Sequence, residues 1–389
     1  MKSIIAFIRR EIVFCIAAIC AVISSFFVPP SRAYISYIDW DTLFILFALM
    51  SVIAALRDCG VFDRMAYILC GHIHKSRILC AVLIMLSFFT SMLITNDVAL
   101  LTFVPFTLAI LGTSTSGKVV LLTVVLETVA ANTGSMLTPL GNPQNLFLFS
   151  KMGTGIGQFM LIILLYSVIS FVLLALSLRF IPDMHLSVSG GTSVQTEFSS
   201  ENETSKEHNL KLPRTAQEII YALLFILCLL CVLRIVPKWI AAVAVFTVLM
   251  ILNRKVLKTV DYMLLLTFAA FFIFTGNIAA IPSIRTFLEE AVSGHEFTVS
   301  VLCSQVISNV PATLLLYPFA KDSQSLLVGV NVGGLGTLVA SLASLISFKL
   351  YSGARKKIEL PSCGKYMAVF TIVNLLFLAI LGTVAILLH

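Results

Sequence analysis

The residues of this chain that could do chemistry are polar side chains inside otherwise apolar stretches. Thr95-Asn96-Asp97 interrupts one such stretch, and Ser308-Asn309 interrupts another. A carboxylate, an amide and a hydroxyl together can hold a proton or a small cation, and they can donate to an anion. Because an Asp at the bilayer centre costs about 2.5–3.5 kcal/mol on insertion scales, Asp97 is a candidate functional residue. The structural alternative is a buried acid that pairs with a neighbouring hydroxyl or amide for packing.

A second acid, Glu127, lies in the apolar run LLTVVLETVAANTG. We predict that Asp97 and Glu127 are coupling residues, which would take up a proton or share a cation during transport. The structural alternative is stronger for Glu127, because this residue could lie close to a membrane face. Both acids belong to the first half of the chain, since Val310 and Leu326 stand at the matching positions of the second half.

Glycines and amides also break two long apolar stretches, 117–152 and 324–351, near their middles. A helix broken at membrane depth exposes N–H groups and carbonyls that bind anions and cations, although small polar residues also serve as packing contacts between helices. The predicted substrate- and ion-binding residues are Thr95, Asn96, Asp97, Asn132, Thr133, Gly134, Thr138, Asn142, Ser308, Asn309, Asn331, Gly333, Gly334 and Thr337. A sodium ion near Asn96, Asp97 and Asn132, or a proton, is the candidate coupling ion. We expect no other cofactor and no other metal.

The elements that hold these residues are predicted to cross a membrane. Hydrophobic residues make up 59% of the 389 residues and charged residues only 12%, whereas soluble domains carry about 25% charged residues. A chain this apolar could not cover its own surface with polar groups, so the predicted fold class is an all-α polytopic membrane protein. The net charge of +7 comes from short basic clusters between apolar stretches, which is the pattern of cytoplasmic loops. The expected partners are therefore the lipid bilayer and a small-molecule or ion substrate, with no nucleic acid.

Hydropathy divides the chain into spans, hairpins and one linker. The stretches 78–113 and 297–321 look too short to cross twice, so we predict re-entrant hairpins whose broken backbone is buried in protein. Residues 182–215 are rich in Ser, Thr, Glu and Asn, and they predict a flexible cytoplasmic linker. The predicted units are an N-terminal span (1–37), repeat 1 (38–181, with a span, hairpin 78–113, broken helix 117–152 and a span), the linker, two connecting spans (216–259) and repeat 2 (260–389, with a span, hairpin 297–321, broken helix 324–351 and a span).

Polar motifs recur in the same order on both sides of the linker. ITNDVALLTFVPF (94–106) aligns with ISNVPATLLLYPF (307–319), and ANTGSMLTPLGNPQNLFLF (131–149) aligns with VNVGGLGTLVASLASLISF (330–348). The opening spans IDWDTLFILFALMSVIAAL and VDYMLLLTFAAFFIFTGNI also align. With a cytoplasmic N-terminus and a periplasmic C-terminus, most of the 26 Lys and Arg residues fall inside. The repeats then run in opposite directions, which is the inverted architecture of secondary transporters.

These motifs resemble those of the ion transporter superfamily, which has citrate-transporter-like membrane domains. ITNDVALLTFVPF resembles the Asn-Asp hairpin tip of the arsenite permease group, and NVGGLGTLVASLASLISFKLY resembles that group's second broken helix. Dicarboxylate symporters of the superfamily carry Ser-Asn-Thr at both tips, whereas this chain carries Thr-Asn-Asp and Ser-Asn-Val, which disfavours dicarboxylate transport. The resemblance covers about 38–351, and it implies an elevator-like motion and often a homodimer.

We therefore expect an ion-coupled permease for a small anion in the cytoplasmic (inner) membrane, driven by protons or sodium. A sodium/proton antiporter without an organic substrate is the near alternative. A channel is disfavoured, because hairpins of this kind usually occlude a path rather than line an open pore. A membrane-embedded enzyme is the alternative from a different class, but all six histidines lie in loops, at span ends or at the C-terminus. We therefore expect no catalytic set and no enzyme.

Overall fold

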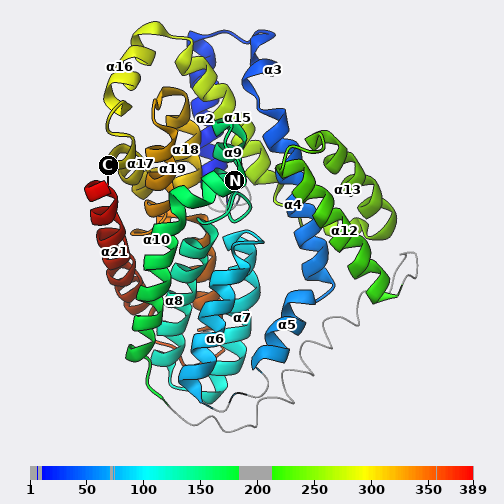
Figure 1. Ribbon diagram of the computed structural model, residues 1–389, viewed down its shortest axis with the longest axis vertical. Coiled ribbons are helices and arrows are strands. Elements are labelled where there is room, and N and C mark those ends of the chain that lie inside the picture. The colour runs from blue at the N-terminus through cyan, green and yellow to red at the C-terminus, as the bar shows by residue number, and fades with distance from the viewer. Residues whose placement is uncertain are drawn as a thin grey trace.

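The computed structural model describes residues 7, 11–70, 73, 75–183, 213–355 and 357–388, which form helices without a strand element (Figure 1). The all-helical class is thereby confirmed. Most of the predicted linker, 184–212, lies outside the described residues. Within the described part, six helical stretches are long and apolar enough to cross a membrane: Trp40–Asp58 (α4), Gly117–Ser135 (α8), Ile156–Phe180 (α10 and the following 3-10 turn), Arg214–Val232 (α12), Arg254–Ala279 (α14 and α15) and Cys363–Leu388 (α21).

Two helices open the predicted repeats, and they begin in the same way. The side chain of Asp39 caps α4 by accepting from the N–H of Thr42 at 3.1 Å. The side chain of Asp261 caps α15 (Tyr262–Ala279) by accepting from the N–H of Leu264 at 3.0 Å. An Asp at this position satisfies an N–H that the helix itself leaves free, and its charge is favourable at a helix N-terminus.

Each opening helix packs against helices from outside its predicted repeat. Helix α4 packs against α12 and α13 (Lys238–Leu252), which lie beside it at the right of Figure 1. Helix α15 packs along α2 (Ile12–Phe27), and Asn277 of α15 donates to Ser24 at 3.0 Å and to the hydroxyl of Tyr34 in α3 (Ala33–Tyr37) at 2.9 Å. Such polar contacts fix the register of apolar helices.

The stretches predicted as hairpins are helix pairs with a sharp turn between them. In the first pair, α6 (Ser76–Thr90) and α7 (Asn96–Ser114) are joined by 91–95. In the second pair, α17 (Glu296–Ile307) and α18 (Asn309–Leu316) meet at Ser308, whose φ of 75° is in the left-handed region. A non-glycine residue rarely adopts that conformation, so this turn is held by the contacts around it. Figure 1 has α6 and α7 in the lower half of the molecule and α17 and α18 in the upper half.

The two long stretches predicted as broken helices are indeed broken. The first consists of α8 and α9 (Pro143–Met152), and the second of α19 (Ser323–Val332) and α20 (Leu342–Ala354), with a short 3-10 turn before α20. Asn142 starts α9 as an N-cap, because its side chain accepts from the N–H of Asn145 at 2.8 Å and a proline follows it. At Gly141 a Cβ would lie 2.0 Å from the backbone oxygen of Ser135, so no larger residue fits.

The broken helices lie at the centre of the molecule. In the most apolar stretch of α8, 83% of the residues are buried inside the protein. In the most apolar stretch of α21, only 22% of the residues are buried. Helices α10 and α21 pack against α8 from outside, and their exposed side chains are apolar ones such as Leu161 and Ile372. Apolar faces of this kind suit contact with lipid. The polar breaks are therefore surrounded by apolar helices.

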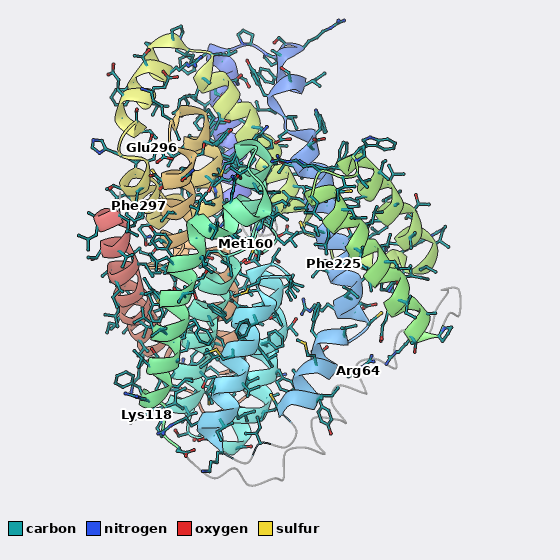
Figure 2. All side chains as sticks on the ribbon, in the orientation of Figure 1. Arg64, Lys118, Met160, Phe225, Glu296 and Phe297 are labelled. Carbon is teal, nitrogen blue, oxygen red and sulfur yellow. The ribbon has the colours of Figure 1, made fainter. Side chains whose placement is uncertain are left out.

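The remaining described elements are short. Helix α5 (Val61–Cys70) follows α4 after a turn at Gly60, whose φ is 69°. Helix α14 (Arg254–Leu257) precedes α15, and α16 (Pro282–Val292) follows it. Figure 2 places Arg64 of α5 and Lys118 of α8 in the lower half of the molecule, and Glu296 in the upper half.

Candidate functional site

The first hairpin tip is docked onto the first helix break. The Asn96 side-chain amide donates to Asn132 Oδ1 at 3.0 Å, and its backbone N–H donates to the carbonyl of Gly141 at 3.0 Å. Asn96 Oδ1 in turn accepts from the N–H of Asp97 at 3.0 Å. Both amide side chains are buried, so these bonds satisfy groups that would otherwise be costly in an apolar interior. The tip and the break form one rigid polar unit.

The first break also contacts the second broken helix. Ser341 donates to Asn132 Oδ1 at 3.1 Å, and the Asn132 amide donates to Ser344 Oγ at 3.2 Å. Asn132 therefore bonds its own hairpin and the start of α20 at once. Since Ser341 and Ser344 are buried as well, this contact joins the two halves of the chain near the centre of the protein.

The second broken helix makes the corresponding contact in return. Asn142 donates to Asn331 Oδ1 at 3.1 Å, and the Asn331 amide donates to Asn145 Oδ1 at 2.7 Å. In the predicted alignment, Asn142 and Asn145 stand at the positions of Ser341 and Ser344. Each break thus bonds the first turn of the helix that follows the other break.

Several predicted ligands are used to close the breaks. The hydroxyl of Thr138 donates to the carbonyl of Met92, and Thr337 donates to the carbonyl of Gln305 at 3.1 Å. Thr133 donates to Val129 within its own helix at 2.8 Å. Each of these hydroxyls donates its proton to a backbone carbonyl, and its oxygen lone pairs can still accept from a ligand or bind a cation.

The predicted glycines allow backbones to approach closely. A Cβ at Gly134 would lie 2.1 Å from the backbone oxygen of Phe88, and one at Gly333 would lie 2.9 Å from the Cα of Val301. A Cβ at Gly334 would lie 2.8 Å from the side-chain nitrogen of Asn309. Each hairpin therefore packs its first helix tightly against the first half of a broken helix.

The second tip repeats part of the first. Asn309 Oδ1 accepts from the N–H of Val310 at 2.9 Å, as Asn96 Oδ1 does from Asp97. Ser308, which precedes it, is buried. Within the described residues no hydrogen bond joins Asn96 directly to Asn309.

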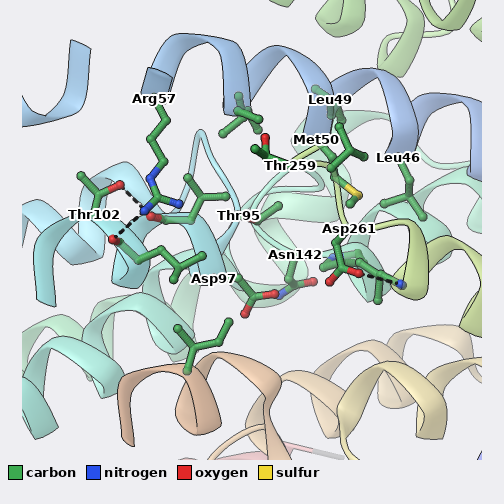
Figure 3. Close-up of a pocket in the computed structure, with 18 of the residues that line it drawn as sticks. Leu46, Leu49, Met50, Arg57, Thr95, Asp97, Thr102, Asn142, Thr259 and Asp261 are labelled. Carbon is green, nitrogen blue, oxygen red and sulfur yellow. Dashed lines mark hydrogen bonds between the residues drawn. The ribbon is translucent and has the colours of Figure 1, made fainter. Parts of the chain in front are cut away.

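A cavity of about 650 Å³ lies beside this network (Figure 3). It is lined by residues of α4, α5 and α7, by the break before α9 and by the start of α15. Of the predicted site residues, Thr95, Asp97 and Asn142 line it. Asp97 is half-buried, and its carboxylate accepts no hydrogen bond from any described residue. The free carboxylate can therefore hold a proton or a cation that enters the cavity.

Four charged residues that line the cavity were missed by sequence reasoning: Arg57, Asp58, Asp63 and Asp261. Arg57, at the end of α4, and Asp261, the cap of α15, both line it. In the sequence, Arg57 follows an apolar run, which is the usual pattern of a basic residue at the cytoplasmic membrane interface. Asp261 aligns with Asp39, but nothing in the sequence brings it to the cavity that contains Asp97. Their nearness is a property of the three-dimensional packing alone.

Glu127 lies apart from this cavity, on the buried part of α8. Its Oε1 accepts from the hydroxyl of Thr107 at 2.5 Å, while Oε2 has no partner among the described residues.

Among the described residues, no group of three or more His, Cys, Asp or Glu side chains could hold a metal ion. A sodium ion would therefore depend on at most two carboxylates together with neutral oxygens.

The sequence matches a transporter family model and several membrane proteins over most of its length. The family model described as citrate transporter matches residues 2–345. An uncharacterized transporter of Methanocaldococcus jannaschii is 35% identical over 317 residues, which cover 81% of this chain and 82% of the relative. The inner membrane protein YbiR of Escherichia coli is 29% identical over 339 residues, which cover 85% of each chain. A 46 kDa membrane protein of Mycobacterium leprae is 23% identical over 361 residues, with 82% and 80% covered.

Proposed function

The chain belongs to the citrate transporter family, and from that premise we propose that it is an ion-coupled secondary transporter for a small anion. The observation that carries the proposal is Asp97, a half-buried carboxylate without a hydrogen-bond partner among the described residues, which lines a cavity of about 650 Å³. An acid at membrane depth without a structural partner is a candidate for carrying a proton or a cation. The cavity is of the size of small-molecule sites.

We also propose that the two halves of the chain are inverted repeats. The equivalent contacts of Asn132 and Asn331, and of Thr138 and Thr337, support this proposal, because they pair residues that align between the halves. The opposite placement of the two hairpins in Figure 1 supports it further. In this arrangement both hairpins are re-entrant, and their tips meet the broken helices near the bilayer midplane.

Coupling would then follow from the charge state of Asp97. With an empty, ionised carboxylate the site carries an uncompensated negative charge, which is unfavourable in a low-dielectric environment. A bound proton or sodium ion neutralises that charge. The site with its ion bound can then move more easily between facing the cytoplasm and facing the periplasm. We propose that the hairpins and broken helices move together against α4, α12 and α13, as in an elevator-like transporter.

The orientation follows from the basic residues. We propose a cytoplasmic N-terminus and a periplasmic C-terminus. We also propose that the membrane is the cytoplasmic one, because the relative YbiR is called an inner membrane protein. Arg64 and Lys118 then lie toward the cytoplasm, together with the end of the cavity near Arg57. A reporter enzyme that works only in the periplasm should be active when it is fused after residue 389. Activity of a fused reporter that works only in the cytoplasm would reverse the assignment. A homodimer is proposed on the resemblance alone.

Reconstituted vesicles with separately imposed gradients test the function. Uptake of labelled citrate, lactate, phosphate and arsenite is measured under a pH gradient, a sodium gradient or neither. We expect uptake of at least one anion that one gradient drives, and none in protein-free vesicles. Sodium/proton exchange without uptake of any anion would favour the antiporter alternative, while no gradient effect on any flux would reject ion coupling.

A further inference from the structure

A groove of about 350 Å³ lies between α5 and α12, and it shares no lining residue with the cavity that contains Asp97. It is lined by Val61, Arg64, Met65 and Ile68 of α5 and by Glu218 of α12. The three apolar side chains form most of its wall, and Ile68 is 65% exposed. An exposed apolar groove with a charged edge suits a molecule that carries both kinds of surface.

The charged edge and the apolar wall are on the same face of α5. Arg64 and Ile68 are four residues apart in this helix, so their side chains lie about one turn, or about 6 Å, from each other along the axis. Only Cys59 and Gly60 separate α5 from the end of the spanning helix α4. In the proposed orientation that end is cytoplasmic, so the groove lies at the level of the lipid head groups of the cytoplasmic leaflet.

Arg64 keeps donor groups that the protein does not use. Its Nη2 donates to Glu218 Oε1 at 2.6 Å, and this is its one hydrogen bond to the described residues. The Arg64 side chain is 54% exposed and that of Glu218 is 22% exposed. A guanidinium has five N–H donors in a planar fork, so most of them remain available to a ligand that enters the groove.

A second arginine adds positive charge beside the groove. Arg214 begins α12 one turn before Glu218. Burial raises the pKa of the Cys59 thiol, just after α4, to about 11. Two nearby acids, Asp58 and Glu218, add to this rise in pKa, whereas Arg214 and Arg64 oppose it. The two arginines therefore lie near the same end of α4, and of the two acids only Glu218 lines the groove.

We propose that this groove binds an anionic phospholipid, with the phosphate on Arg64 and an acyl chain against Met65 and Ile68. An arginine fork matches a phosphate with two parallel hydrogen bonds. Basic pockets between membrane helices on the cytoplasmic side bind lipid head groups in the same way. Glu218 competes with the phosphate for the guanidinium, so it weakens lipid binding.

The bound lipid would join two parts of the protein that otherwise share one ion pair. Helix α5 packs against α4, α6 and α7, and it leads from α4 into the first hairpin. A lipid in the groove bridges α5 and α12, and it therefore holds the entry of that hairpin against the helices beside α4. This inference goes beyond the proposed function, and it needs neither a substrate nor a coupling ion.

Lipid binding to the purified full chain in detergent tests the proposal. The midpoint of thermal unfolding is followed as the mole fraction of phosphatidylglycerol in the micelles rises, because a ligand of the folded state raises this midpoint. Phosphatidylcholine with the same acyl chains replaces the anionic head group by one without net charge. Glycerol phosphate in solution supplies the phosphate without acyl chains. The variants are Arg64→Gln, Glu218→Gln and Ile68→Ser.

Each kind of variant has a matched control. Arg254→Gln removes another exposed arginine of the proposed cytoplasmic face, whose guanidinium donates to the carbonyl of Met250 at 2.8 Å and which does not line the groove. Ile372→Ser removes an apolar side chain of α21 that is 68% exposed, about as much as Ile68. Both controls should bind phosphatidylglycerol as the unaltered chain does.

The expected result is that phosphatidylglycerol stabilises the unaltered chain more than phosphatidylcholine does, and that glycerol phosphate has no effect. Arg64→Gln should raise the half-saturating mole fraction about fivefold, the contribution of one basic side chain at an anionic membrane surface. Ile68→Ser should raise it about threefold through lost apolar contact. Glu218→Gln should lower it about two- to fivefold, because it leaves the whole guanidinium to the phosphate.

The opposite signs of the two charge variants separate a lipid site from a simple ion pair. If Arg64 and Glu218 serve only to hold α5 to α12, both substitutions lower the unfolding midpoint and neither changes the response to phosphatidylglycerol. That result overturns the proposal, as does equal stabilisation by the two lipids. Stabilisation by glycerol phosphate as large as that by phosphatidylglycerol would show a phosphate site without a lipid, and it would also reject the proposal.

Discussion

Asn132 of α8 and Asn331 of α19 make matching hydrogen bonds across the centre of the protein. Asn132 donates to Ser344 at 3.2 Å and Asn331 donates to Asn145 at 2.7 Å, and the two acceptors align with each other in the sequence. All four residues are buried. Because buried amides without partners are costly, the two broken helices are fixed to each other at this point.

We expect that Asn331→Ala weakens both stability and transport. The substitution removes the acceptor Oδ1 that the Asn142 amide bonds at 3.1 Å and the donor that bonds Asn145 Oδ1 at 2.7 Å. Leaving a buried group unsatisfied in this way should cost about 1–3 kcal/mol. Thermal unfolding in detergent measures the first effect, and anion uptake by vesicles with matched protein content measures the second. Asn374→Ala is the control, because Asn374 is a buried amide of α21 that bonds only the carbonyl of Phe370 among the described residues.

The expected difference lies in transport. Asn374→Ala should lower the unfolding temperature without changing uptake per folded molecule, whereas Asn331→Ala should reduce uptake severalfold even when folded. Equal uptake by the two variants would mean that the contacts of Asn331 hold the fold and have no part in transport.

Asp97→Asn should abolish gradient-driven transport while leaving the fold intact. The substitution keeps the shape and the hydrogen-bonding capacity, but it removes the charge that would bind the coupling ion. Vesicle uptake with and without a pH or sodium gradient gives the measurement. Glu127→Gln should have a smaller effect, because Glu127 does not line the cavity and its Oε1 is already bonded to Thr107 at 2.5 Å. If Asp97→Asn transports at the full gradient-driven rate, Asp97 is a structural acid. If only Glu127→Gln loses coupling, the coupling residue is Glu127.

The parts of the site that could be predicted from sequence are those set by local backbone chemistry. Gly134, Gly141 and Asn142 mark a helix break and a new N-cap, and both features follow from residue type and order. The pairing of the two breaks was predictable because Asn132 and Asn331 recur in equivalent motifs. Motif spacing is sufficient where the interaction is between neighbours in sequence or between repeats.

Side-chain direction and distant packing could not be predicted in this way. Thr138 and Thr337 are predicted as ligands, and the structure adds contacts that the sequence does not indicate, since their hydroxyls donate to the carbonyls of Met92 and Gln305. A hydroxyl can serve a backbone carbonyl or a ligand equally well, and the sequence does not distinguish the two. Arg57 reaches the cavity because α4 packs beside α7, a relationship that no local pattern encodes.

Two glycine substitutions should act in opposite directions. Gly134→Ala would place a Cβ 2.1 Å from the backbone oxygen of Phe88, so the first hairpin must shift. Such overpacking typically costs about 1–3 kcal/mol, and we expect a lower unfolding temperature and reduced uptake. Gly157→Ala, in α10, meets no atom within 4 Å and should be neutral or stabilising by up to about 1 kcal/mol. A Gly134→Ala protein as stable and active as Gly157→Ala would show that this close approach is not required.

The end of α9 is joined to α4 and α12 by contacts that a moving site would have to break. Lys151 pairs with Asp39 at 2.8 Å, Ser150 lies 3.3 Å from the hydroxyl of Thr42, and Arg234 donates to the carbonyl of Phe149 at 2.7 Å. Arg57, at the other end of α4, lines the cavity. These contacts would therefore keep the site closed at the proposed periplasmic end, while the cavity reaches Arg57 at the proposed cytoplasmic end of α4.

We expect that Lys151→Met, which removes the ion pair with Asp39, makes the cavity accessible from the periplasm more often. The readout is the rate at which an impermeant thiol reagent, added outside intact cells, labels a cysteine introduced by Leu146→Cys in a background without other cysteines. Leu146 lines the cavity. A partly exposed ion pair contributes about 0.5–1 kcal/mol, so labelling at neutral pH should rise about two- to fivefold. The control is Arg285→Met, which removes an exposed ion pair with Glu289 on α16.

The same ion pair predicts how labelling depends on pH. Burial raises the pKa of Asp39, but Lys151 and the hydrogen bonds from Thr42 more than offset this and hold that pKa below its ordinary value of 3.8. A carboxylate with a lowered pKa stabilises the closed arrangement fully above its ordinary pKa and loses that contribution as the pH falls through the lowered value. A thiol reagent reacts with the thiolate, whose fraction falls with pH, so the labelling rate of the Leu146→Cys protein is divided by the rate of the same protein with Lys151→Met at the same pH. This ratio should stay low and constant from neutral pH to about pH 4 and rise toward one only below it. A rate that is the same with and without Lys151 at neutral pH would mean that this ion pair does not hold the site closed.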